Sequence, residues 1–239
     1  MSFFNKDMIF CATGIEALKS HLKRLAESQA KTSGSLVNDA VLAIKKQVLE
    51  DQDIALRQLT ETFDGPRLES FLVTKDEIKD AYSQVSEAWL KALKRAKANI
   101  EAFHSHQLPK NWEDKPEAGI SYGWRFSPLD AVGLYVPGGQ AIYPSSVLMN
   151  AIPAKLAGVK RTVMVSPPQN DGFLPASVLV AADLCGVDEI VKVGGAQAIF
   201  ALAYGTQSIK KVDKIVGPGN AYVTAAKQMV YGAVDIDKP

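Results

Sequence analysis

The sequence has little cysteine and no long apolar run. Its two cysteines, Cys11 and Cys185, lie far apart and have no neighbouring cysteine. We therefore interpret them as thiols in a reducing compartment, rather than as a disulfide framework or a metal site. Charged residues interrupt Met1–Ser20, so it does not resemble a signal peptide. No stretch approaches the roughly 20 apolar residues that cross a bilayer. The sequence thus predicts a cytoplasmic protein without a membrane partner.

Neither sign of charge dominates, and histidine is scarce. The 27 basic and 26 acidic residues leave a net charge of +1, which gives no reason to expect a nucleic-acid partner. Of the three histidines, His21 falls on the apolar stripe of an expected helix, where a packing or interfacial role is favoured. His104 and His106 are two positions apart at a helix end, so they point to different faces and cannot easily share a metal ion.

Catalytic signatures are also missing. The sequence contains no cysteine–histidine cluster and neither the H-E-x-x-H nor the G-x-S-x-G motif. Ser145 and Ser146 precede an expected helix with no histidine nearby, so we interpret them as helix caps rather than nucleophiles. The residues alone therefore indicate no catalytic acid–base pair and no metal ligands in this chain.

The first half of the sequence reads mainly as helices. Apolar residues recur every three or four positions, and Thr74 with Glu77 forms a capping-box pattern. We expect helices at 15–25, 36–48, 51–63 and 84–106, a short strand at 71–73, a break at 108–115 and a strand at 119–126.

From residue 131 the pattern changes to short apolar runs that alternate with helical spacing. Such alternation is typical of right-handed βαβ units and a parallel sheet. The fold class we predict is α/β, with an incomplete Rossmann-like parallel sheet at 131–232 after a helical N-terminal region. The expected strands are 131–136, 162–166, 189–193 and 213–216, and the expected helices are 145–157, 174–185, 196–204 and 220–231.

The sequence stops after this series, where another strand would be expected. Residues 234–239 show no capping residue, polar tail or obvious helix. We therefore expect the chain to be a truncated portion of a longer protein, with a domain border near 127–131.

Three glycine-containing corners each follow an expected strand and open into a helix: Tyr135–Gly139, Gly194–Gln197 and Gly217–Asn220. In parallel α/β folds, ligands bind beyond the carboxyl ends of the strands, where backbone N–H groups and helix N-termini are available. Tyr135, Gln197 and Asn220 supply polar or aromatic groups there.

The glycines have a second interpretation, because tight turns alone also require them. The dinucleotide fingerprint G-x-G-x-x-G is absent, and no acidic residue ends the second expected strand to hold a ribose. The residues themselves favour a nucleotide-like ligand without deciding between these interpretations.

At these corners the sequence closely resembles the histidinol dehydrogenase family. The resemblance covers essentially all 239 residues, and motifs of this length are highly specific. The matching segments are 132–139 (VGLYVPGG), 143–154 (YPSSVLMNAIPA), 193–199 (VGGAQAI), 203–206 (AYGT) and 212–220 (VDKIVGPGN), with 63–65 (FDG) and 99–107 (NIEAFHSHQ) in the first half.

The resemblance implies a zinc-dependent homodimer that oxidises L-histidinol through an aldehyde to L-histidine in two NAD-linked steps. By motif, the NAD contacts would be Tyr135, Gln197 and Asn220. The family's zinc ligands and its catalytic acid–base pair fall in segments that this sequence lacks. We therefore expect the chain to hold no catalytic or metal-binding residue and to be inactive alone.

The resemblance also suggests three parts: an N-terminal helical tail (1–33), the N-terminal half of a first α/β domain (34–130) and an inserted Rossmann-like NAD-binding domain (131–239). Two alternatives remain open. The chain could be a non-catalytic folding or dimerisation module, because its amphipathic helices need partners. It could also belong to another NAD-linked alcohol or aldehyde dehydrogenase.

Overall fold

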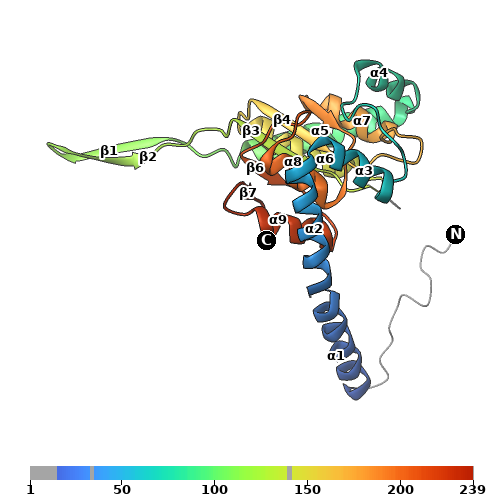
Figure 1. Cartoon of the computed structure of the whole chain (residues 1–239). Helices are drawn as coiled ribbons and strands as arrows, with labels where there is room; N and C mark the ends of the chain where they lie inside the picture. Colours follow the sequence, from blue (N-terminus) through green and yellow to red (C-terminus); the bar gives the residue numbers. More distant parts are fainter. Residues whose placement is uncertain (1–14, 33–34, 139–141, 239) are drawn as a thin grey trace.

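In the computed structural model, which describes residues 15–32, 35–138 and 142–238, a parallel sheet lies between two groups of helices (Figure 1). The sheet contains β3 (Ala131–Tyr135), β4 (Arg161–Val165), β5 (Glu189–Val191), β6 (Lys214–Val216) and β7 (Asp235–Ile236).

All neighbouring strands of this sheet are parallel, in the order β5-β4-β3-β6-β7. This is the doubly wound order with its last strand missing, and the direction of winding reverses between β3 and β6. The structure therefore confirms the predicted α/β class with a Rossmann-like parallel sheet. The two-residue strand β7 was not among the predicted strands. It pairs with β6 and lies within residues 234–239, for which no strand was predicted.

Most helices fall close to the predicted ranges, but the first extends beyond its predicted end at residue 25, and the fourth was marked in the sequence only by its capping-box pattern. The capping box is confirmed, because the Glu77 N–H donates to Thr74 Oγ1 and the Thr74 N–H donates to a Glu77 carboxylate oxygen, both at 3.1 Å. The helices are α1 (Ile15–Thr32), α2 (Ser35–Asp51), α3 (Asp53–Phe63), α4 (Lys75–Ser83), α5 (Glu87–Ser105), α6 (Pro144–Leu156), α7 (Ala176–Leu184), α8 (Gly195–Tyr204) and α9 (Ala221–Val230).

Both faces of the sheet are buried. Alternate side chains of β3 point to opposite faces, so Leu134 joins one apolar core and Tyr135 the other. Helices α6 and α7, with α4 and α5 packed outside them, cover the Leu134 face. Helices α8 and α9, with α2 outside them and α3 beside α8, cover the Tyr135 face. A sheet covered on both faces explains the continuous apolar runs of its central strands.

The two cores contain residues from both sides of the proposed border near 131. Val41 and Leu56, for example, share a core with Ile199 and Val223. The division into parts at 1–33, 34–130 and 131–239 stays a prediction, but helices before residue 106 complete the layers around the sheet.

Two predictions about local structure were incomplete or wrong. Ser145 and Ser146 do not cap α6: its N-cap is Tyr143, which makes no side-chain cap bond, and Pro144 occupies the first turn. Proline lacks an N–H and has a helical φ, so the helix can begin there and the serines fall inside it. The segment 108–115 is not only a helix break, because β1 (Trp112–Glu117) pairs antiparallel with β2 (Ile120–Trp124). Figure 1 shows this exposed hairpin extending away from the sheet.

The strand predicted at 71–73 forms in part. Leu72 makes an isolated antiparallel bridge to Val191, and the Val73 N–H donates to the carbonyl of Ile190 at 2.9 Å. Of the cysteines, Cys11 lies outside the described residues. Cys185 is buried and is a free thiol in the described part of the chain, and burial raises the pKa of this thiol to about 11.

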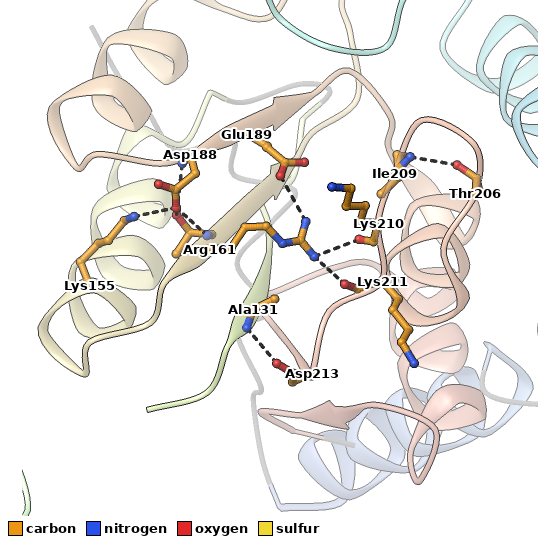
Figure 2. Close-up of polar contacts among 11 residues, drawn as sticks. Ala131, Lys155, Arg161, Asp188, Glu189, Thr206, Ile209, Lys210, Lys211 and Asp213 are labelled. Atoms are coloured by element: carbon orange, nitrogen blue, oxygen red, sulfur yellow. Dashed lines mark hydrogen bonds and ion pairs between the residues drawn. The ribbon is translucent and has the colours of Figure 1, made fainter. Parts of the chain in front are cut away.

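Polar contacts fix the amino-terminal ends of the central strands (Figure 2). The Asp188 carboxylate, just before β5, accepts from Lys155 Nζ at 2.7 Å and from the N–H and hydroxyl of Thr162 at 2.7 and 2.8 Å. The Asp213 carboxylate, before β6, accepts from the N–H of Ala131 at 2.8 Å. These contacts set the relative positions of neighbouring strands at the amino-terminal end of the sheet, where β3, β4 and β5 begin.

We expect Asp188→Asn to lower the free energy of unfolding at neutral pH by about 1–3 kcal/mol, because it weakens charge-assisted hydrogen bonds. Burial acts to raise the pKa of Asp188, but hydrogen bonds from Lys155 and Thr162 outweigh it and keep the pKa below its usual value. The stabilisation is therefore present above the unfolded pKa of about 4 and is lost as the pH falls through the folded pKa.

Urea denaturation across this pH range measures the effect. Asp130→Asn is the matched control, because Asp130 forms an exposed ion pair with Lys160 and such surface pairs contribute little. This role of Asp188 would be contradicted if both variants lost the same free energy of unfolding. It would also be contradicted if the destabilisation by Asp188→Asn stayed the same below pH 4 as at neutral pH.

Candidate functional site

A cleft of about 830 Å³ lies beyond the carboxyl ends of the sheet strands. Its volume falls within the roughly 300–1,000 Å³ of small-molecule sites. Tyr135, Gln197 and Asn220, predicted from three separate corners, all line this one cleft. The structure therefore brings the three residues together, at the point where the strand order reverses. Whether they contact NAD stays a prediction.

Tyr135 is the last residue of β3 and is only 4% exposed. Its hydroxyl oxygen accepts a hydrogen bond from the N–H of Gly195 at 3.1 Å, which joins the first and second corners. Burial raises the pKa of this phenol to about 12, and the nearby Asp64 charge adds to the rise while the Gly195 bond opposes it. Tyr135 is thus a neutral phenol at physiological pH and can donate its own proton to a ligand.

Gln197, in the first turn of α8, is 1% exposed, and neither its Oε1 nor its Nε2 has a hydrogen-bond partner among the described residues. An unsatisfied buried polar group costs about 1–3 kcal/mol. The preceding Gly195 has φ +64°, and a Cβ there would lie 2.4 Å from Gln197 Oε1. The corner therefore accommodates a buried amide that the protein itself does not satisfy, as expected of a group reserved for a ligand.

The side chain of Asn220 caps a helix through its oxygen atom and leaves its nitrogen atom available to a ligand. Its Oδ1 accepts from the N–H of Val223 at 3.0 Å, so it caps helix α9. Its Nδ2 makes no hydrogen bond to the described part of the chain and remains available as a donor. This donor lies at the start of a helix, where partial positive charge favours anionic ligands.

The third corner is held on both sides. Gly217 has φ +118°, and a Cβ there would lie 2.1 Å from the carbonyl oxygen of Tyr135, so only glycine fits. Its N–H donates to Asp237 Oδ2 at 2.9 Å, and its carbonyl accepts from Lys227 Nζ at 3.0 Å. Lys227, 5% exposed, also forms an ion pair with Asp237.

At the other two corners, the glycines are required for packing. A Cβ at Gly138 would lie 2.6 Å from a ring carbon of Pro167, and one at Gly194 would lie 2.4 Å from another. Pro167 follows β4 by two residues and sits between these corners. These two glycines therefore have a structural role, close packing against Pro167, which differs from the tight turns considered in the sequence analysis. The argument for a ligand depends on the polar side chains instead. Gly139 lies outside the described residues.

Sequence reasoning missed Asp64, which follows α3 and also lines the cleft. Its Oδ2 is buried without a hydrogen-bond partner among the described residues, and burial raises its pKa to about 6. In the sequence, this position belongs to the FDG segment (63–65) of the family resemblance and directly follows the helix predicted at 51–63, and neither feature indicated a site residue. Nothing in local spacing could show that this end reaches the strand corners.

The remaining walls are mostly apolar. Four prolines contribute to them, and the largely exposed aromatic rings of Phe63 and Tyr222 lie along the cleft as well. An apolar lining with a few convergent polar groups is the usual composition of a cofactor or substrate site. The prolines are Pro137, Pro167, Pro168 and Pro175.

No group of three or more possible metal ligands occurs among residues 15–32, 35–138 and 142–238. His104, near the end of α5, makes a 2.6 Å hydrogen bond between its Nδ1 and the side chain of Gln107, and His106 caps that helix. The residues described here therefore do not fit a zinc site. No helix in the same ranges is long and apolar enough to cross a membrane.

Comparisons with known proteins agree on one family. A sequence model described as histidinol dehydrogenase matches residues 27–239. The chain is 53% identical over 219 residues to histidinol dehydrogenase from Clostridium acetobutylicum, covering 92% of this chain and 51% of that protein. It is 55% identical over 198 residues to the Geobacillus kaustophilus enzyme, covering 83% and 47% respectively.

The crystal structure of histidinol dehydrogenase from Elizabethkingia anophelis superposes with a TM-score of 0.83 at 39% identity. That match covers 86% of this chain and 48% of the other. The chain thus spans about half the length of the relatives it matches. On the family match and these identities, the chain belongs to the histidinol dehydrogenase family.

Proposed function

We propose that this chain forms the NAD-binding portion of a histidinol dehydrogenase, an oxidoreductase of histidine biosynthesis. The observation that carries the proposal is the buried, unpartnered amide of Gln197, in one cleft with Tyr135 and Asn220. The family's substrate, L-histidinol, belongs to the proposal, as do a cytoplasmic location and a homodimer.

The polar groups of the cleft suit a dinucleotide. Gln197 offers one acceptor and two donor hydrogens, Asn220 offers Nδ2 donors beside a helix N-terminus, and Tyr135 offers a neutral hydroxyl. Amide and hydroxyl groups of this kind can hold ribose hydroxyls and phosphate oxygens. When bound, NAD would supply the acceptor for a hydride from the substrate. The chain's own contribution is to bind and orient it among apolar walls that limit access of water.

The described residues do not fit zinc, because no group of three or more possible metal ligands occurs among them. We therefore assign no zinc ligand and no catalytic acid or base to this chain. The resemblance implies that other segments of the whole enzyme would supply those groups, and they remain part of the proposal for the whole enzyme.

The alternative of a folding or dimerisation module has one observation in its favour. Apolar side chains on α1 and α2 are solvent-exposed, Ile15 at 73% and Leu36 at 81%. Such residues support self-association, which the homodimer proposal includes, but they do not explain an unsatisfied amide in a cleft. The family match likewise disfavours another NAD-linked alcohol or aldehyde dehydrogenase.

We expect the chain to bind NAD saturably and Gln197→Met to weaken this binding by at least about tenfold, or 1.4 kcal/mol. Methionine is close in shape to glutamine but offers no amide. Because it removes unsatisfied polar atoms, the melting temperature should stay equal or rise. Titration calorimetry and thermal unfolding measure the two effects. Gln228→Met, on an exposed face of α9, is the control and should leave both unchanged.

Asn220→Ser tests the second contact without removing the helix cap, because serine also caps helices well. We expect weaker NAD binding with little loss of stability. If the wild-type chain associates with itself but does not respond to NAD, the module alternative replaces the proposal.

We further expect that the 239-residue chain binds NAD without producing NADH from L-histidinol, since its described residues offer no metal-ligand cluster. Absorbance of NADH at saturating substrate and zinc measures this. NADH formation above a no-protein blank, or one zinc ion bound per chain, would refute the assignment of catalysis to other segments.

A further inference from the structure

Asp64 brings a carboxyl group into the cleft from outside the sheet. It directly follows helix α3, whereas Tyr135, Gln197 and Asn220 follow the sheet strands or begin the helices after them. Among the described residues that line the cleft, Asp64 carries the only charged side chain; no lysine or arginine is among them.

Hydrogen bonds at both ends of helix α3 hold Asp64 in place. Its N–H and that of Gly65 both donate to the carbonyl of Thr60, at 2.8 and 3.1 Å, and Gly65 has φ +98°, which ends the helix. At the other end of α3, the Asp53 carboxylate accepts hydrogen bonds from the N–H and hydroxyl of Ser208. The helix that carries Asp64 is therefore tied to the loop after α8.

The carboxyl group of Asp64 has a buried oxygen, Oδ2, that accepts no hydrogen bond from the described residues. Burial of this kind disfavours the charged form and raises the pKa to about 6, so the group is mainly ionised at neutral pH and acts only as an acceptor. Asp64 and Tyr135 line the same cleft, and the Asp64 charge contributes to the raised pKa of Tyr135.

We propose that Asp64 accepts a hydrogen bond from a ribose hydroxyl of the bound dinucleotide, and that it thereby selects NAD over its ribose-phosphorylated form, NADP. This inference rests on the proposed function of the cleft. It assigns to α3 a task that dinucleotide folds usually give to an acidic residue about 20 residues after the glycine-rich corner.

The sheet itself lacks that acidic residue. Strand β4 continues into Ser166 and Pro167, which offer no carboxylate. Asp64 supplies one from a different part of the sequence. A hydroxyl can donate to it, whereas a phosphate in the same place offers no such donor and repels it. With no lysine or arginine among the described lining residues, nothing on these walls would offset that repulsion.

The test compares dissociation constants for NAD and NADP, measured by titration calorimetry near neutral pH. The variants are Asp64→Asn and Asp64→Ala. Glu61→Gln is the matched control, because it removes the same charge from an exposed position on the same helix. We expect wild type and Glu61→Gln to prefer NAD. Asp64→Ala should bind NAD about tenfold more weakly, and Asp64→Asn should reduce the preference for NAD by at least about tenfold, because its amide can donate to a phosphate.

The possible results distinguish the role of Asp64 from the proposed binding of NAD in the cleft. If both Asp64 variants keep the wild-type ratio of the two constants while Gln197→Met still loses NAD, the role of Asp64 is overturned and the cleft remains an NAD site. If wild type binds neither nucleotide, both fall. Asp64→Asn removes a buried charge, so it should melt no lower than wild type, and it decides the test if Asp64→Ala fails to fold.

Discussion

The central strand β3 is the constraint on which the rest of this structure depends. All five of its residues are buried, and it pairs with β4 on one side and β6 on the other. Packing leaves no room along it: a Cβ at Gly133 would lie 2.8 Å from a methyl carbon of Leu202. Because the winding of the chain reverses beside this strand, the connections diverge at its carboxyl end, and a cleft opens there rather than elsewhere.

The two ends of the sheet differ in how their polar groups are satisfied. At the amino-terminal end, Asp188 and Asp213 accept hydrogen bonds from the chain itself. At the carboxyl end, the amide of Gln197 and the Oδ2 atom of the half-buried Asp64 are buried without a partner in the described structure. Groups at one end add stability, and groups at the other lower it. Proteins commonly accept such a loss at sites that a ligand completes.

Sequence patterns predicted most of the fold, because apolar spacing reports which faces are buried. They missed β1, which is exposed at every position, and β7, which has only two residues, although the equally exposed β2 lies within the strand predicted at 119–126. Tyr135, Gln197 and Asn220 could be located because each lies at a corner between a strand and a helix. Asp64 could not, because its approach to the cleft depends on how α3 packs. Nor could the sequence show that Gly138 and Gly194 both make room for Pro167.

The contacts of Gly217 have a consequence for the order in which this protein is assembled. Both backbone groups of Gly217 are held by Lys227 and Asp237, which lie after it in the chain, and Asp237 follows the last strand of the sheet. A ribosome makes the Tyr135 side of the cleft about a hundred residues before it makes Asp237. Until Asp237 docks, the third corner lacks the contacts that fix its backbone. The capacity to bind ligand should therefore arise only after Asp237 has been made, and the nascent chain would pass through a stage with a packed β3 but an unfinished cleft.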